Sequence, residues 1–230
     1  MPNPSFVYNP PMSPFLSLLY RDDDIIVAQK PSGLLSVPGK ALEHKDALIT
    51  RVNLVYPSAT VVHRLDMATS GIMVFALNKP SHRAISKQFE LRQTKKRYFA
   101  RVYGNIAHDS GEVNLPLICD WPNRPKQMVD HENGKPSLTR FQVVARDDNT
   151  TLVALYPVTG RSHQLRVHML SLGHPILGDR LYAHEDALKL APRLQLHAET
   201  LQFAHPTSGD MLTFTSPVPF TNTALPPFEQ

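Results

Sequence analysis

A short polar loop between two apolar runs holds the side chains best suited to chemistry. Residues 61–76 read V-V-H-R-L-D-M-A-T-S-G-I-M-V-F-A, and Asp66 lies in the polar middle. The apolar flanks predict two short buried strands, which would hold the loop and its carboxylate in place. An aspartate is ionised at neutral pH and can form a covalent adduct, as carboxylates do in glycosidases. The plain alternative is a surface loop in which Asp66 and Arg64, on one side of an extended segment, form an incidental ion pair.

The order of residues in this loop resembles the active-site motif of the RluA-type pseudouridine synthases, in which H-R-L-D is followed by T-S-G and an apolar run. Four further segments resemble the other motifs of that family and occur in the family's order: residues 30–34 (K-P-S-G-L), 96–104 (K-R-Y-F-A-R-V-Y-G), 160–168 (G-R-S-H-Q-L-R-V-H) and 173–179 (G-H-P-I-L-G-D). The resemblance extends from about residue 18 to residue 214. It therefore covers nearly the whole chain.

The resemblance implies an isomerase that converts uridine in RNA into pseudouridine without a cofactor or a metal. Asp66 would be the catalytic residue, adding either to the base ring or to the sugar carbon. Arg166 would keep the Asp66 carboxylate charged, because burial alone favours the neutral form. Tyr98 would stack on the target uracil. The expected catalytic residues are Asp66, Arg166 and Tyr98.

Further residues are expected to bind the substrate. By resemblance, Arg64 would fill the space left by the flipped uridine, and Leu165 would pack on the base and exclude water. Lys30 would face phosphate as a point charge, and Arg161 and His163 are left for structural or substrate-facing hydrogen bonds. The expected substrate-binding set is Arg64, Leu165, His63, Lys30, Arg161 and His163.

The expected substrate is structured RNA. Residues 115–126 (L-P-L-I-C-D-W-P-N-R-P-K) resemble the branch of the family that modifies both large-subunit (23S) ribosomal RNA and the transfer RNA anticodon stem-loop. These residues begin a long polar connection with Trp121, Arg124, Lys126 and Lys135. A connection of this length is usually functional or disordered. We interpret it as an excursion that contacts RNA.

Composition limits the other classes of protein. A chain of 230 residues with 42% hydrophobic residues can bury a core, and a net charge of +4 allows a polyanionic partner without requiring one. The single Cys119 excludes an intramolecular disulfide and suits a reducing compartment. No apolar run approaches the length of a membrane span, and the start does not resemble a signal peptide. We expect a cytoplasmic monomer with no membrane partner and no obligatory protein partner.

Apolar spacing predicts the elements that position the motifs. Helices are expected over residues 46–55, 80–92, 161–172 (starting near Ser162) and 185–190. Strands are expected at 16–20, 25–29, 98–103, 112–118, 139–145, 152–158, 195–203 and 211–215. Because these elements do not alternate regularly, the chain is predicted to be α+β with a largely antiparallel sheet. The resemblance implies a mixed sheet with the active-site cleft across it.

The predicted organisation is one catalytic domain over residues 16–216. Residues 1–15 would be a flexible arm or an extended segment lying on the domain, and residues 217–230 a proline-rich tail. The catalytic motifs begin by Lys30, so no S4-like module is expected before them.

Two rival functions differ in how well they fit the sequence. The 11 histidines include no H-E-x-x-H or other ligand pattern, which argues against a metal-dependent hydrolase. A non-catalytic RNA-binding protein, such as an RNA chaperone built on the same fold, stays open. The presence of Asp66, Arg166 and Tyr98 together favours the enzyme.

Overall fold

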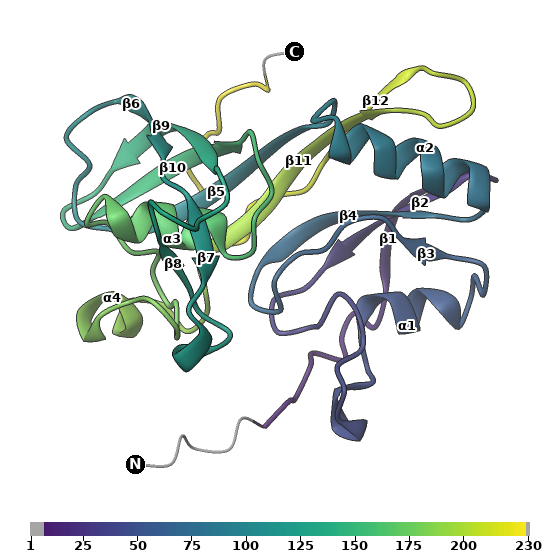
Figure 1. The fold of residues 1–230 in the computed structure, drawn as a ribbon, viewed down its shortest axis with the longest axis horizontal. Coiled ribbons are helices and arrows are strands. Elements are labelled where there is room, and N and C mark those ends of the chain that lie inside the picture. Colours follow the sequence, from purple (N-terminus) through teal and green to yellow (C-terminus); the bar gives the residue numbers. More distant parts are fainter. Residues whose placement is uncertain (1–6, 229–230) are drawn as a thin grey trace. The chain divides into compact units, whose positions relative to one another are not determined.

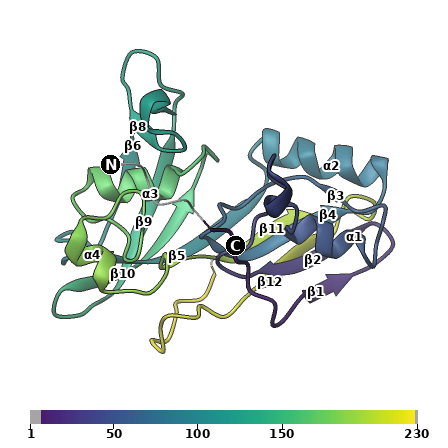
Figure 2. The ribbon, with the colours of Figure 1, turned by 90° about the horizontal axis from the view of Figure 1, so that it is seen from below.

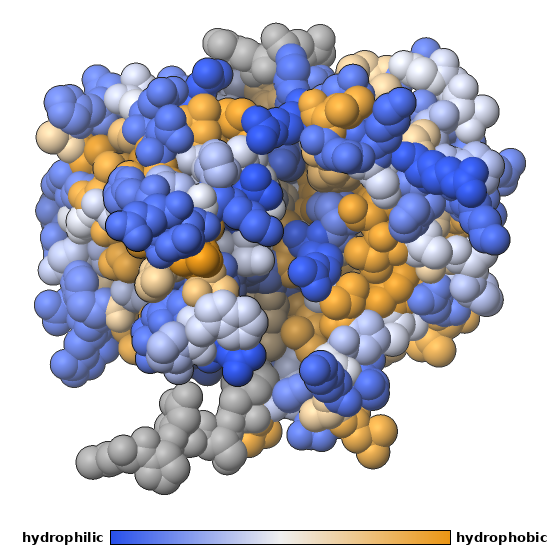
Figure 3. Space-filling model, in the orientation of Figure 1, coloured by the Kyte–Doolittle hydropathy of each residue, from blue (hydrophilic) through white to orange (hydrophobic). Residues whose placement is uncertain are grey.

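The computed structural model describes residues 7–228, and contacts divide this stretch into two compact units (Figure 1). Unit 1 comprises residues 7–91 and 204–212, and unit 2 comprises residues 92–203 and 213–228. The strand pairs of both units are antiparallel and the helices are few, which confirms the predicted α+β class. Hydrophilic side chains cover much of the face drawn in Figure 3. The boundaries predicted for the catalytic domain stay a prediction.

Unit 1 is built on three strands in the order β1 (Ser17–Arg21), β2 (Ile25–Lys30) and β4 (Ser70–Ala76). The two-residue strand β3 (Thr60–Val61) also pairs with β4. Strand β4 is buried along its whole length, as its continuous apolar run predicts. The other elements of unit 1 are η1 (Leu42–His44), α1 (Leu48–Asn53) and α2 (Lys79–Glu90).

A polar cluster ties residues 204–212 to the rest of unit 1. The Asp24 carboxylate accepts hydrogen bonds from Thr207 Oγ1 at 2.6 Å and from Asn78 Nδ2 and Ser81 Oγ at 2.7 Å. These bonds lower the pKa of Asp24 to about 2. Asn78 also caps α2, because its Oδ1 accepts from the Ser81 N–H at 2.9 Å. One carboxylate therefore joins the β1–β2 turn, the start of α2 and the returning chain.

The described part of the N-terminal segment lies on unit 1 and bends at residues 13–15. Arg51 Nη1 donates to the carbonyls of Pro11 and Phe15, each at 2.9 Å. The Tyr8 hydroxyl donates to the Asp46 carbonyl at 2.8 Å. These bonds attach the segment to the rest of unit 1 at Tyr8, Pro11 and Phe15. Residues 1–6 of the predicted arm lie outside the described residues.

The sheet of unit 2 has the order β11 (Leu196–Ala204), β5 (Lys95–Tyr103), β10 (Thr150–Pro157), β9 (Leu138–Arg146) and β6 (Ser110–Asn114). Strand β12 (Met211–Thr215) pairs with β11. Helices α3 (Gln164–Ser171) and α4 (Glu185–Lys189) follow β10 in the chain. A separate hairpin consists of β7 (Leu117–Cys119) and β8 (Gln127–Val129), with the single turn η2 (Trp121–Asn123) between them.

The proline-rich tail lies on unit 2. Val218 is buried in a cluster with Phe99, Leu152 and Ala154. Arg97 Nη1 donates to the carbonyls of Pro226 and Pro227 at 2.9 and 3.0 Å, while Arg97 also forms a buried ion pair with Glu199. The prolines cannot donate to a ladder. The tail is therefore held by side chains and by its own carbonyl groups.

Candidate active site

The loop that carries Asp66 is fastened to residues 30–36 on both sides of the aspartate. Before it, the Leu65 N–H donates to Ser36 Oγ at 3.1 Å, and Ser36 Oγ donates to the Leu65 carbonyl at 2.6 Å. After it, the Met67 carbonyl accepts from the Gly33 N–H at 2.9 Å. Asp66 is half-buried in this loop. The structure thus places the aspartate between strands β3 and β4, as the sequence predicts. Strand β4 is buried as expected, whereas the prediction of burial is wrong for β3, where Thr60 is exposed and Val61 is half-buried.

Lys30 does not face solvent, which corrects the expectation that it contacts phosphate. Its side chain is fully buried at the end of β2. Its Nζ donates to the carbonyls of Leu34 at 2.6 Å, Met67 at 2.9 Å and Pro31 at 3.0 Å. An ammonium group has three protons, and three carbonyls accept here. Lys30 therefore joins its own loop to the loop of Asp66 and acts as a positioning residue.

His63 also makes contacts within unit 1. Its Nε2 accepts from the Val74 N–H at 3.1 Å, so the neutral ring carries its proton on Nδ1. The ring stacks on Phe89, with centroids 4.6 Å apart and planes 19° apart. These contacts join the loop to β4 and α2, and the expected contact of His63 with RNA stays a prediction. Arg64, between His63 and the buried Leu65, is exposed.

The arginine motif begins with a turn in unit 2 that Gln164 holds together. Its Oε1 accepts from Thr159 Oγ1 at 2.6 Å and from the Arg161 N–H at 3.0 Å. Its Nε2 donates to the Leu138 carbonyl at 3.0 Å. His163 has a left-handed backbone (φ 54°), so α3 begins at Gln164, slightly later than the predicted start near Ser162. The turn and the helix are thereby fixed to β9.

Arg166 has a carboxylate partner that the sequence did not reveal. The side chain is buried, and its Nε and Nη2 donate to Asp179 Oδ2 and Oδ1 at 2.8 and 2.7 Å. This parallel, two-bond geometry is the strongest arginine–carboxylate arrangement. Asp179 follows Gly178, whose positive φ of 69° and close approach to the Arg193 carbonyl admit only glycine, since a Cβ would lie 2.1 Å from that oxygen.

Tyr182 joins the arginine motif to the β7–β8 hairpin. Its hydroxyl is 2.7 Å from His163 Nδ1 and accepts from the Gln127 N–H, also at 2.7 Å. The Arg166 guanidinium carbon lies 5.0 Å from the centre of its ring. The contact with Tyr182 is a structural hydrogen bond of His163, and its predicted contact with the substrate stays a prediction. The sequence places Tyr182 only three residues after the quoted motif, and no pattern indicated its contacts.

Tyr98 lies on the face of the unit 2 sheet that carries α3. It pairs with Leu155 of β10, which in turn pairs with Phe141 of β9. Paired residues share a face, as do residues two apart in a strand, so Thr139 lies on this face too. The Thr139 hydroxyl contacts both Gln164 and His168 of α3. The structure therefore brings Tyr98 to the side of the sheet on which Leu165 and Arg166 stand.

The predicted site residues divide between the two units. Lys30, His63, Arg64 and Asp66 belong to unit 1, and Tyr98, Arg161, His163, Leu165 and Arg166 belong to unit 2. Leu165 is buried, and Arg161 is exposed with its Nε 3.3 Å from the Pro136 carbonyl. The expected approach of Asp66 to Arg166 and Tyr98 stays a prediction.

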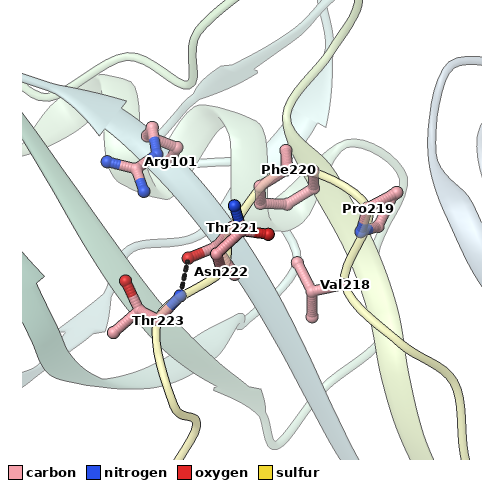
Figure 4. A pocket seen from close by; sticks show the side chains of 7 residues that line it. All are labelled: Arg101, Val218, Pro219, Phe220, Thr221, Asn222 and Thr223. Carbon is pink, nitrogen blue, oxygen red and sulfur yellow. Dashed lines mark hydrogen bonds between the residues drawn. The ribbon is translucent and has the colours of Figure 1, made fainter.

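A cavity in unit 2 is lined by none of the predicted site residues. It has a volume of about 690 Å³ and is lined by Arg101 and residues 218–223 of the tail (Figure 4). Arg101 forms an ion pair with Asp147, and its Nη1 donates to Thr150 Oγ1 at 3.1 Å.

Among residues 7–228, no three His, Cys, Asp or Glu side chains are grouped so that they could hold a metal ion. No helix in the described part of the chain has the length and apolarity needed to cross a membrane.

Comparisons with known proteins agree with the motifs. A model of the RNA pseudouridylate synthase family matches residues 24–171. The dual-specificity RNA pseudouridine synthase RluA of Salmonella typhimurium (strain LT2) is 59% identical over 214 residues, which cover 93% of this chain and 98% of that protein. The protein of the same name from Escherichia coli (strain K12) is 58% identical over 214 residues, with the same coverage.

Solved structures agree as well. Human RNA pseudouridylate synthase domain containing 1 matches with a TM-score of 0.76 and 30% identity, covering 95% of this chain and 87% of that one. The family model alone spans more than half of the 230 residues. The chain therefore belongs to the RNA pseudouridylate synthase family and, within it, to the RluA-type enzymes.

Proposed function

We propose that this chain converts specific uridines in stem-loops of both large-subunit ribosomal RNA and transfer RNA into pseudouridine, with Asp66 as the nucleophile. The proposal of two RNA targets rests on one observation. The chain is 59% identical to a relative named as a dual-specificity synthase, and the match covers 98% of that relative. The observation that supports Asp66 is the loop of unit 1, in which Lys30 and Ser36 fasten the residues on both sides of this carboxylate.

The reaction exchanges one bond to the sugar for another. The bond between the ribose C1′ and the base nitrogen N1 breaks, the base rotates, and C1′ joins carbon C5; C5 then loses its proton and N1 gains one. Atoms and electrons balance without an oxidant, a reductant or an energy donor. Asp66 forms the covalent adduct that keeps the fragments bound, either on the base ring or on C1′.

Unit 2 supplies the partners of the nucleophile in this proposal. Asp179 anchors Arg166 through Nε and Nη2, and in this proposal the charge of the guanidinium keeps the Asp66 carboxylate ionised. Tyr98 stacks on the uracil, and Leu165 packs against the base, where an apolar surface excludes water that would hydrolyse the adduct. Arg64 enters the RNA in place of the flipped uridine.

An Asp66→Asn variant tests the nucleophile. The amide has nearly the same shape but cannot attack, so we expect RNA binding within about twofold of wild type and no detectable pseudouridine in stem-loop substrates. Asp23→Asn, a change at an exposed aspartate of unit 1, is the matched control and should keep full activity. Isomerisation by the Asp66→Asn protein would exclude Asp66 as the nucleophile.

Mapping pseudouridine in cellular RNA with and without this protein tests the targets. Loss of sites in both ribosomal and transfer RNA supports dual specificity, and loss in one class alone contradicts it. Intact pseudouridine in both, together with RNA binding, would favour the non-catalytic RNA chaperone. The expected cytoplasmic location follows from these substrates. The expected monomer, with no obligatory protein partner, is checked by light scattering of the purified protein.

A further inference from the structure

The tip of the β7–β8 hairpin presents an aromatic ring to solvent. Trp121, in the turn η2, is 65% exposed, and it is the only tryptophan of the chain. The guanidinium carbon of Arg124 lies 4.8 Å from the centre of its ring. Figure 2 shows β8 in the part of unit 2 that stands away from β5 and β10. Neither residue has a place in the catalytic steps above.

The tip is held in one shape by its own hydrogen bonds. The Asp120 N–H donates to the Lys126 carbonyl at 2.9 Å, and the Asn123 N–H donates to the Asp120 carbonyl at 3.0 Å. Asn123 Nδ2 donates to both Asp120 carboxylate oxygens, at 3.1 and 2.9 Å. Pro122 restricts the backbone further. A ring on such a turn needs little ordering when it meets a partner.

An exposed cation, Arg124, lies beside the ring. The carboxylates near the ring accept hydrogen bonds from within the hairpin. Asp120 accepts from Asn123 Nδ2, and Asp130 accepts from the N–H groups of Glu132 and Asn133 at 2.9 and 2.8 Å. Arg124 makes no ion pair within residues 7–228, and its guanidinium lies over the face of the Trp121 ring. An exposed ring beside an exposed cation that makes no ion pair suits a nucleic acid, because a base can stack on the ring while phosphate meets the guanidinium. A protein partner would need a wider apolar patch.

The base of the hairpin rests on residues that also hold the arginine motif. Leu117 and Lys135 exchange backbone hydrogen bonds at 3.0 and 2.8 Å, which closes the excursion. The Gln127 N–H donates to the Tyr182 hydroxyl, and Tyr182 contacts His163 and Arg166. The exposed ring is therefore attached by a short, bonded path to the turn that positions Arg166.

We propose that Trp121 and Arg124 form a stacking platform for an unpaired base of the RNA stem-loop, separate from the uridine that is modified. The platform contributes to the choice of substrate, because a stem-loop that places a splayed base over Trp121 binds more tightly than one that does not. This inference rests on the proposed function for the identity of the RNA. It adds a contact at a position that the catalytic residues do not include.

The single tryptophan gives a direct test in the unmodified protein. A synthetic transfer RNA anticodon stem-loop is titrated into the wild-type chain and into Asp66→Asn, and tryptophan emission is recorded beside filter binding. Stacking should quench the emission with the same midpoint as binding. Unchanged emission at saturating RNA, or no binding of the stem-loop, would overturn the platform and leave the hairpin as a contact for another macromolecule.

Substitutions separate stacking from charge. Trp121→Ala should weaken stem-loop binding about tenfold and raise KM with little change in kcat, while Trp121→Phe should restore binding to within about threefold. Arg124→Gln should lower the slope of log affinity against log salt by about one. Leu190→Ala, which truncates another exposed apolar side chain of unit 2, is the matched control and should bind as wild type. Equal binding by Trp121→Ala would contradict the platform.

The outcomes distinguish this inference from the proposed function. Pseudouridine formation by a protein whose tryptophan emission does not respond to RNA removes the platform and leaves the enzyme. Quenching by RNA without pseudouridine formation removes the enzyme and leaves the platform. Because Trp121 is exposed, its replacement should not disturb the core, and circular dichroism of the variants checks this.

Discussion

Arg64 is the exposed residue in a loop whose other residues are buried or half-buried. His63 stacks on Phe89 and Leu65 is buried, so the backbone that carries Arg64 is fixed from both sides. The long, positively charged side chain of Arg64 can therefore enter the RNA while the backbone of the loop keeps its fold. In the proposed function Arg64 acts as a wedge, which means that it enters the RNA in place of the flipped uridine. This role requires a rigid backbone beneath the side chain, and the structure supplies one within unit 1.

Replacing Arg64 by alanine tests the wedge. Extruding a base from a folded stem-loop costs a few kcal/mol, and about 1.4 kcal/mol corresponds to a factor of ten in rate. We expect kcat/KM on a hairpin to fall at least about tenfold, with a smaller loss on an unstructured oligonucleotide. Arg83→Ala, at an exposed arginine of α2, should leave both values unchanged. Equal losses on the two substrates would argue against a wedge.

The individual side chains show what a sequence can and cannot predict. The position of Asp66 was predictable, because the apolar runs on either side indicate strands that hold the loop between them. The inward direction of Lys30 was not, since a lysine after a strand can face solvent or donate to three carbonyls of a neighbouring loop with the same local sequence. The Arg166–Asp179 pair was hidden for a similar reason. Its members are 13 residues apart and meet only through the fold.

At the scale of elements, the segment after α3 connects two parts of unit 2. Residues 173–182 hold Arg166 through Asp179, and they hold the hairpin through the Tyr182 hydroxyl. The sequence indicated the helices and most strands correctly, because their apolar spacing is regular. It did not indicate where the hairpin is attached, because Gln127 and Tyr182 are 55 residues apart and neither belongs to an apolar pattern.

Removing one hydroxyl tests this connection. Tyr182→Phe leaves the Gln127 N–H without its acceptor while keeping the ring beside Arg166, so the hairpin should open more readily. The loss of one hydrogen bond of about 1 kcal/mol predicts roughly fivefold faster hydrogen exchange at the Gln127 amide. Tyr103→Phe, elsewhere in unit 2, is the control and should leave that amide unchanged. Unaltered exchange in Tyr182→Phe would show that the hairpin is held by other contacts.

At the scale of the whole molecule, segments distant in sequence complete each unit. Residues 204–212 complete unit 1 through the bonds to Asp24, and the tail completes the core of unit 2 through Val218. Composition could not predict this. Prolines exclude helix and ladder but say nothing about which surface an extended segment covers. Both units therefore depend on the last part of the chain, and a buried group there should affect the stability of the molecule.

His197 on β11 is such a group. It is fully buried, and its Nε2 lies 3.2 Å from Ser216 Oγ, just before the tail. Burial first, and the charge of Arg193 second, lower the pKa of His197 to about 4. The unfolded chain binds this proton below an ordinary pKa of about 6.5, whereas the native protein excludes it until about pH 4. Between these values the unfolded state holds more protons, so stability falls as pH falls.

The expected loss can be measured by urea unfolding at pH 7 and pH 5. At pH 5 a histidine with this shift removes about 2 kcal/mol of the free energy of unfolding. The buried His168, whose pKa is also lowered by burial, acts in the same direction, so the wild-type difference should be larger still. His197→Gln should lessen the difference between the two pH values by about 2 kcal/mol, whereas His131→Gln, at an exposed position of unit 2, should not change it. If His197→Gln and wild type show the same pH dependence, protonation of His197 does not limit the stability of the fold.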